Sequence, residues 1–182
     1  MEKKKILIIS IVVVVAIGIL ISNMIVSKHT KVLLETNEGD IVLELYTGEM
    51  PITAGNFIKL VKDGFYDGVV FHRVISGFMI QSGDQTGTGR GGPGYTIKDE
   101  FTGTKLDRND RGTVSMANTG KPDSGGSQFF INVADNNFLD GKHPVFGKVI
   151  EGLEIVDKIS RVEIDENDKP IEEVMISKAK VI

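Results

Sequence analysis

Short aliphatic segments separated by glycine-rich turns run through most of this 182-residue sequence and constrain its fold more than any other feature. Only two stretches have the periodicity of a helix. Many short strands with few helices favour a mainly β, closed antiparallel barrel, although this pattern alone does not exclude a sandwich. The predicted strands are Val32–Thr36, Ile41–Leu45, Val69–Val74, Phe78–Gln81, Thr113–Met116, Gln128–Asn132, Val145–Val149, Glu173–Ser177 and Lys180–Ile182.

Local signals support this reading. Asn37–Asp40 contains a glycine between the first two segments and predicts a β-hairpin. Pro51 suits the first position of a helix, and Gly64 is placed to end it. A second short helix is expected after Gly152. The apolar faces of the two helices are Ala54, Phe57, Ile58 and Val61 in the first, and Leu153, Val156 and Ile159 in the second.

The N-terminus carries a different kind of signal. Residues 6–26 form a run of 21 without a charge, and Lys3, Lys4 and Lys5 precede it. A helix of this length reaches about 30 Å, which is enough to cross a bilayer core. The lysines favour a cytoplasmic N-terminus. We therefore expect a cytoplasmic segment (1–5), a transmembrane signal anchor (6–26), a linker (27–31) and a domain outside the cytoplasm (32–182).

Two alternatives for this run compete with a single-pass membrane anchor. A cleaved signal peptide would release a secreted domain, but its apolar core is usually about 7–15 residues long, and Ile21–Val26 is a poor cleavage sequence. A buried soluble helix is disfavoured because the run has no polar face.

Composition excludes several kinds of chemistry. Without cysteine there is no disulfide, thiolate nucleophile or Cys-ligated zinc. His29, His72 and His143 lack metal-ligand spacing, so no metal is expected. The net charge of −4 argues against nucleic-acid binding. Gly87–Gly94 ends without the Gly-Lys-Ser/Thr of a phosphate-binding loop and is read as a surface loop at the edge of a groove.

The stretch Phe71–Asp84 carries the strongest functional signal, because it sets one cation, Arg73, among large apolar side chains. In a strand, Arg73 and Ile75 share one face. A break at Ser76–Gly77 would gather further side chains around a concave apolar surface with the guanidinium at its rim. The side chains gathered there would be Arg73, Phe78, Met79 and Gln81.

This stretch resembles the signature of the cyclophilin family of peptidyl-prolyl cis/trans isomerases. Three further motifs follow in the family's order: Ser115–Asn118, Gly126–Ile131 and Leu139–Gly147. The resemblance covers residues 31–182. It implies a closed eight-stranded antiparallel barrel with a helix covering each end and an active groove on its outer surface. The expected form is membrane-anchored and prokaryotic-like.

The resemblance also implies roles for single residues. Arg73 matches the catalytic arginine, which would donate a hydrogen bond to the prolyl nitrogen, and His72 has a supporting role. Gln81 and Asn118 match groups that bind the substrate backbone, and Ala117 and Gln128 match further groove positions. The apolar pocket for the proline ring matches Phe78, Met79, Phe130, Leu139 and His143, and Phe138 belongs to the same groove.

Three positions depart from the common family pattern. Ser76 stands where proline is frequent, and Ser82 stands where glycine is frequent. Phe138 stands where cyclosporin-sensitive members carry tryptophan, and it lacks the indole N–H donor. We therefore expect proline binding to be retained and cyclosporin to bind weakly.

The leading functional hypothesis is an isomerase without a cofactor that accelerates folding of exported, proline-containing chains, because prolyl isomerisation limits folding for seconds to minutes. A holdase chaperone that captures proline segments is the alternative, although capture alone needs no cation. A structural subunit of a membrane assembly is a third reading, but the apolar run has no intramembrane charge and no Gly-x-x-x-Gly pattern.

Overall fold

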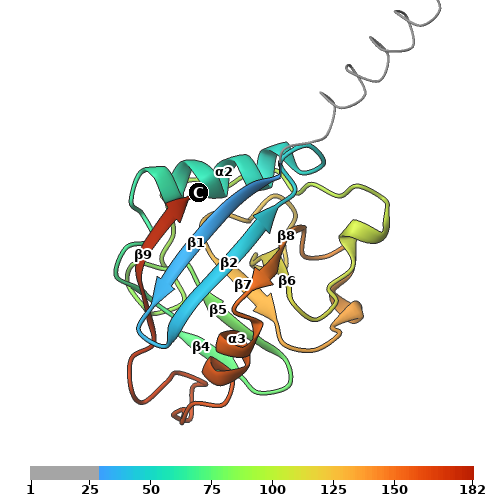
Figure 1. Ribbon diagram of the computed structural model, residues 1–182. Coiled ribbons are helices and arrows are strands. Elements are labelled where there is room, and N and C mark those ends of the chain that lie inside the picture. Colours follow the sequence, from blue (N-terminus) through green and yellow to red (C-terminus); the bar gives the residue numbers. More distant parts are fainter. Residues whose placement is uncertain (1–28) are drawn as a thin grey trace, which may run out of the picture.

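An antiparallel sheet of nine strands curls around the core of residues 29–182, the part of the chain that the computed structural model describes (Figure 1). The strand order is β3-β9-β1-β2-β8-β6-β7-β5-β4. The strands are β1 (Thr30–Thr36), β2 (Gly39–Leu45), β3 (Val69–Val70), β4 (Arg73–Ile75), β5 (Met79–Ser82), β6 (Thr113–Met116), β7 (Phe129–Asn132), β8 (Val145–Glu151) and β9 (Met175–Val181).

The closed eight-stranded barrel is therefore corrected to a curled sheet of nine strands. The predicted strand Val69–Val74 is interrupted at Phe71 and His72, because its first part pairs with β9 and its second part pairs with β5. These two parts, β3 and β4, are the opposite ends of the strand order, so two residues connect the two edges of the sheet. The two predicted C-terminal strands are instead one strand, β9.

The first hairpin forms as the sequence predicts. Its register runs from Thr30 opposite Leu45 to Thr36 opposite Gly39, which leaves a two-residue turn. Alternating side chains of both strands point inward and are fully buried: Val32, Leu34, Ile41, Leu43 and Leu45. The expected period of two thus supplies one wall of the core.

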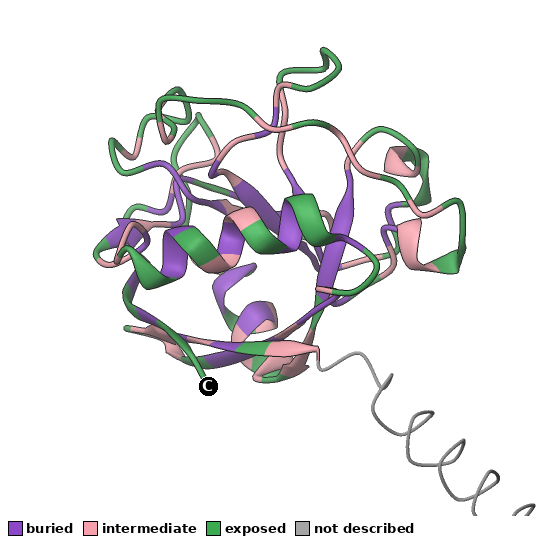
Figure 2. Cartoon of the chain, turned by 90° about the horizontal axis from the view of Figure 1, so that it is seen from above, coloured by how far each residue is buried: buried purple, intermediate pink, exposed green. Residues whose placement is uncertain are grey.

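Helix α2 (Pro51–Lys62) packs one face on the sheet and exposes the other, as the alternation of purple and green in Figure 2 shows. Its first backbone N–H groups donate to the carboxylate of Glu100, at 3.0 Å from Ile52 and 3.0 Å from Thr53. At the other end Gly64 takes a positive φ of 70°, and the N–H of Phe65 bonds back to the helix. The buried face is Thr53, Ala54, Phe57, Leu60 and Val61.

Helix α3 (Leu153–Ile159) buries Val156 and Ile159 and lies apart from α2, at the other end of the sheet in Figure 1. Two single 3-10 turns complete the elements, η1 (Lys105–Asp107) and η2 (Asn137–Leu139). The two predicted helices are thus confirmed. No helix of residues 29–182 is long and apolar enough to span a bilayer. The predicted anchor at 6–26 and the segment 1–5 lie outside the described residues.

Aromatic rings fill the centre of the core. Phe57 of α2 lies 4.8 Å from the ring of Tyr66, 5.1 Å from Phe129 and 5.2 Å from Phe146. The hydroxyl of Tyr66 donates to the carbonyl of Ser127 at 2.9 Å, and burial raises the pKa of this phenol well above its ordinary value. The core therefore fixes the segment that precedes β7, which carries the candidate site.

Candidate active site

The hairpin of β4 and β5 positions the cation that the sequence singled out. A turn at residues 76–78 separates the two strands, and Gly77 adopts a φ of 71°, so the predicted break at this point is confirmed. Arg73 pairs directly with Gln81 across the hairpin. Directly opposed residues of an antiparallel pair share a face, so the guanidinium and the amide project from the same side of the sheet.

Arg73 and Gln81 begin a row of outward-facing side chains that continues across the neighbouring strands. Gln81 is opposite Phe130 of β7, and Met79 is opposite Asn132. The alternate residues, among them Val74, Ile80 and Ile131, belong to the core cluster on the other face. Met79 and Phe130 are only 2% and 4% exposed, yet neither belongs to that cluster. Their burial therefore comes from the outer surface of the sheet.

An apolar wall forms beside this row. The ring of Phe78 stacks on Phe138 at 5.8 Å, and Phe130 meets His143 edge-on at 5.4 Å. His143 is oriented by a 3.1 Å hydrogen bond between Nδ1 and the carbonyl of Met116. We define the apolar wall as Phe78, Met79, Phe130, Phe138, Leu139 and His143.

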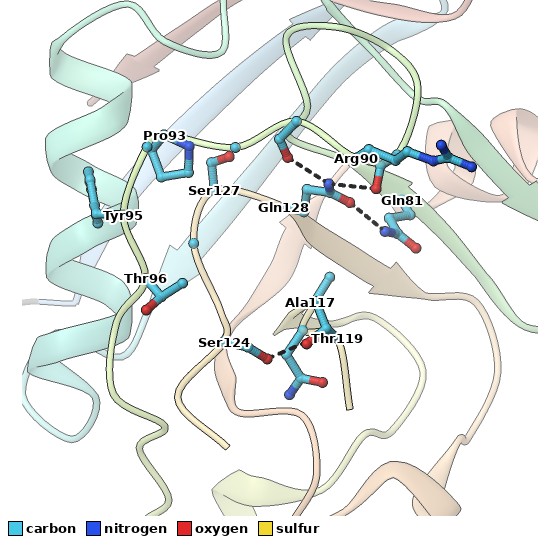
Figure 3. A pocket seen from close by; sticks show the side chains of 16 residues that line it. Gln81, Arg90, Pro93, Tyr95, Thr96, Ala117, Thr119, Ser124, Ser127 and Gln128 are labelled. Atoms are coloured by element: carbon cyan, nitrogen blue, oxygen red, sulfur yellow. Dashed lines mark hydrogen bonds between the residues drawn. The ribbon is translucent and has the colours of Figure 1, made fainter. Parts of the chain in front are cut away.

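A cavity of about 810 Å³ adjoins the outer row at Gln81 (Figure 3). The predicted residues Gln81, Ala117, Asn118 and Gln128 line it. Gln81 donates to Gln128 at 2.9 Å, and the Gln128 amide donates to the carbonyls of Gly89 and Gly91 at 3.0 and 2.9 Å. The outer row is thereby connected to the glycine-rich loop.

That loop, expected only to shape the groove edge, forms a wall of the cavity. Asp84 is fully buried, and its carboxylate accepts hydrogen bonds from the backbone N–H groups of Thr86 and Thr88 at 2.8 and 3.0 Å and from both hydroxyls. Burial raises the pKa of Asp84, but bonds from Thr86, Gly91 and Thr88 outweigh it and hold the pKa well below its ordinary range. The loop is organised around an ionised carboxylate.

Two neighbouring motif residues have structural surroundings that the sequence did not indicate. Ser82 is buried, and its hydroxyl donates to the carbonyl of Val70 at 2.9 Å, which joins β5 to β3 where the sheet curls on itself. His72 is 7% exposed, and neither ring nitrogen has a hydrogen-bond partner among residues 29–182. Burial lowers the pKa of His72, and the charge of Asp84 partly opposes this.

The predicted residues therefore gather in two adjacent groups. The apolar wall and Arg73 lie outside the lining of the cavity, and Gln81 belongs to both the row and the cavity. Sequence reasoning missed several cavity residues, including Tyr95, Thr119 and Ser124, because nothing in their local pattern marks them. It also missed Asp168, whose carboxylate lies 3.4 Å from Nε of Arg73. Within residues 29–182, no three His, Cys, Asp or Glu side chains are grouped to hold a metal.

Comparisons with known proteins agree with this geometry. The sequence profile described as "Cyclophilin type peptidyl-prolyl cis-trans isomerase/CLD" matches residues 31–181. The chain is 46% identical over 156 residues to peptidyl-prolyl cis-trans isomerase-like 1 of Gibberella zeae, covering 84% of this chain and 95% of that protein. It is 48% identical over 149 residues to the isomerase ppi1 of Schizosaccharomyces pombe, covering 80% and 95%.

The fold is also similar to solved structures. A cyclophilin type peptidyl-prolyl cis-trans isomerase of Cryptosporidium parvum superposes with a TM-score of 0.80 at 38% identity, covering 85% of this chain and 98% of that chain. A second structure of the same protein, obtained in the presence of the dipeptide Ala-Pro, gives a TM-score of 0.79.

Proposed function

The chain belongs to the cyclophilin-type peptidyl-prolyl cis-trans isomerase family, and we propose that the groove around Arg73 and Gln81 is its active site. The activity is isomerisation of the peptide bond that precedes proline. One observation carries the site assignment. Arg73 and Gln81 pair directly on the outer face, so a permanent cation stands beside both the apolar wall and the amide-lined cavity.

Arg73 is proposed to act on the prolyl nitrogen. Rotation about the bond is slow because it breaks amide resonance, with a barrier of about 20 kcal/mol. A hydrogen bond donated to the nitrogen lone pair withdraws it from conjugation with the carbonyl. The guanidinium suits this task because it stays protonated and presents several donors in a rigid fork. A thousand- to millionfold acceleration requires about 4–8 kcal/mol of preferential transition-state stabilisation.

The apolar wall and the amide side chains are proposed to bind different parts of the substrate. The apolar wall suits the proline ring, because the accessible rings of Phe78 and Phe138 stack on each other and the outward-facing Met79 and Phe130 add apolar side chains beneath the surface. The amides of Gln81 and Asn118 suit the peptide backbone, and the Asn118 amide is itself held by a 2.8 Å bond to the carbonyl of Lys142. The Ala-Pro dipeptide used with the Cryptosporidium relative supports a substrate that contains the Xaa-Pro unit. No cofactor enters this chemistry.

The alternative is a holdase that captures proline segments without depending on turnover. An isomerisation assay and an aggregation assay on the same Arg73→Ala protein discriminate the two functions. The isomerase proposal predicts that Arg73→Ala loses catalysis in the protease-coupled assay. Lost catalysis in Arg73→Ala combined with unchanged protection of an aggregating client would favour the holdase, whereas full catalysis in Arg73→Ala would overturn the catalytic role of Arg73.

We also propose that the domain lies outside the cytoplasm on a single-pass membrane anchor and acts on exported chains. The support is the sequence alone: 21 uncharged residues from Ile6 to Val26 behind three lysines. Protease added to intact cells should digest the domain and leave a short protected N-terminal fragment. A domain that stays intact until the cells are lysed would contradict this orientation, and a released domain would indicate cleavage after export.

Weak cyclosporin binding is proposed from Phe138. Phe138 is 63% exposed, its ring stacks on Phe78, and its side chain has no N–H donor to offer. Phe138→Trp should strengthen inhibition of the isomerase by cyclosporin about tenfold, in line with one added hydrogen bond. Nanomolar inhibition of the unmodified protein would refute the proposal.

A further inference from the structure

A loop from the C-terminal part of the chain is docked against the strand that carries Arg73. We name residues 163–171 the Asp168 loop. Ile171 N donates to the carbonyl of Glu163 at 2.9 Å, and Ile164 and Pro170 form an antiparallel bridge inside that pair. The loop is therefore a short hairpin with its own backbone pairing.

The tip of the Asp168 loop is organised by one carboxylate. Oδ1 of Asp165 accepts from the backbone N–H groups of Asn167 at 2.8 Å and of Lys169 at 3.0 Å. These bonds, to Lys169 first and then Asn167, lower the pKa of Asp165. Asp168 lies between the two donors with a positive φ of 64°, a conformation that aspartate and asparagine tolerate better than most residues.

Asp168 makes two contacts with β4. Its carbonyl accepts from the N–H of Val74 at 2.8 Å, which fixes the loop to the residue after Arg73. Its carboxylate Oδ2 lies 3.4 Å from Nε of Arg73. Because the backbone of Asp168 is bonded to Val74, the fold itself holds the Asp168 carboxylate beside Arg73.

We propose that Asp168 is a positioning residue for Arg73 that orients the guanidinium for catalysis. Nε is the inner nitrogen of the fork, so a partner there leaves the two terminal nitrogens available to a substrate. Arg73 is 44% exposed, and an unrestrained arginine would distribute among many rotamers. A partner at Nε restricts the rotamers of Arg73 before substrate binds. Less side-chain entropy is then lost when the guanidinium bonds to the twisted prolyl bond in the transition state. The inference rests on the proposed role of Arg73.

The size of the effect follows from the exposure of the pair. Side chains that are 44% and 40% exposed make a screened ion pair, so the Coulombic energy is small and the orientation matters more. Loss of the Asp168 side chain should therefore slow catalysis by about three- to fivefold, far less than loss of Arg73 itself.

Three variants of the full-length chain in detergent test this role. Asp168→Gly removes the side chain and suits the positive φ. Asp168→Asn keeps the backbone conformation and an acceptor oxygen but removes the charge. Glu166→Gln, at an exposed position of the same loop, removes one charge and serves as the matched control.

We expect Asp168→Gly to lower kcat about three- to fivefold with KM within twofold, because orientation is used after binding. Asp168→Asn should stay within twofold of the wild-type kcat, and Glu166→Gln should be unchanged. The ¹⁵N–¹H resonance of the Arg73 Nε group should shift in Asp168→Gly and stay in place in Glu166→Gln.

Two results would overturn the proposal. One is a wild-type kcat in Asp168→Gly. The other is an equal loss of activity in Asp168→Gly and Glu166→Gln while the Arg73 Nε resonance stays in place. That combination would indicate a general charge effect. If Arg73→Ala kept full activity, the role of Arg73 would fail, and the Nε resonance would still report whether Asp168 holds the side chain.

Discussion

At the scale of single residues, Arg73 and Gln81 show how pairing in a sheet creates a site. The two lie eight positions apart in sequence but directly opposite in the hairpin. The sequence predicted the break at Ser76–Gly77 and the gathering of both side chains on one surface, but the direct pairing is known only from the structure. The sequence was not sufficient to predict Asp168, which approaches Arg73 from 95 residues away in a loop that has no strand or helix pattern.

His72, next to Arg73, should make the free energy of unfolding depend on pH. Its pKa is lowered by burial from the ordinary 6.5, so the unfolded chain binds the proton more readily than the folded one. The free energy of unfolding should therefore hold its full value above about pH 6.5 and fall as the pH drops below it. Urea unfolding between pH 7.5 and 5, roughly spanning the ordinary pKa of histidine, measures this.

The control for this prediction is His72→Gln, which cannot titrate. The difference in stability between wild type and His72→Gln should change with pH over that window. A constant difference would show that His72 is not held neutral by the fold. Carboxylates contribute to both proteins alike, so the difference isolates the imidazole.

At the scale of elements, the glycine-rich loop is the part whose role the sequence least revealed. Eight residues with five glycines, Gly87–Gly94, suggested a flexible edge, because glycine adds backbone freedom. The structure instead ties the loop to the buried Asp84 and to the Gln128 amide. The signal that could have indicated this is the Asp84, Thr86 and Thr88 spacing, since these side chains commonly bond to nearby backbone groups.

Two adjacent glycines of this loop provide a matched test. A Cβ at Gly91 would overlap Oδ1 of Asp84, whereas a Cβ at Gly92 would meet nothing within 4 Å. Gly91→Ala should lower the free energy of unfolding by about 2 kcal/mol, and Gly92→Ala should change it by less than about 0.5 kcal/mol. Thermal and urea unfolding measure both. Equal effects of the two substitutions would mean that Asp84 does not anchor the loop.

Other elements were predictable to different degrees. The β1–β2 hairpin and α2 followed from local patterns, since Pro51 and Gly64 mark the helix and alternation marks the strands. The interruption at Phe71 and His72 was not predictable, because it arises where one strand changes partner from β9 to β5. Such a break depends on the closure of the whole sheet and leaves no local signature.

At the scale of the whole molecule, the curl of the sheet explains why the site lies on the outside. One face of β5, β6 and β7 supplies Ile80, Val114 and Ile131 to the core, which leaves Met79 and Phe130 to the outer groove. The pattern of short strands favoured a closed antiparallel barrel without excluding a sandwich, and the family resemblance supplied the count of eight strands. Strand number and closure depend on long-range pairing, which the local sequence does not encode.

The central claim is that Arg73 accelerates rotation of the prolyl bond in a bound substrate. The most direct test is the rate at which a bound Xaa-Pro peptide interconverts between its cis and trans forms on the enzyme, measured by NMR exchange for wild type and Arg73→Ala. We predict that Arg73→Ala slows this on-enzyme rate about 10- to 100-fold, the value of one charge-assisted hydrogen bond, and changes peptide affinity less than about threefold. An on-enzyme rate equal to that of the wild type would contradict the account.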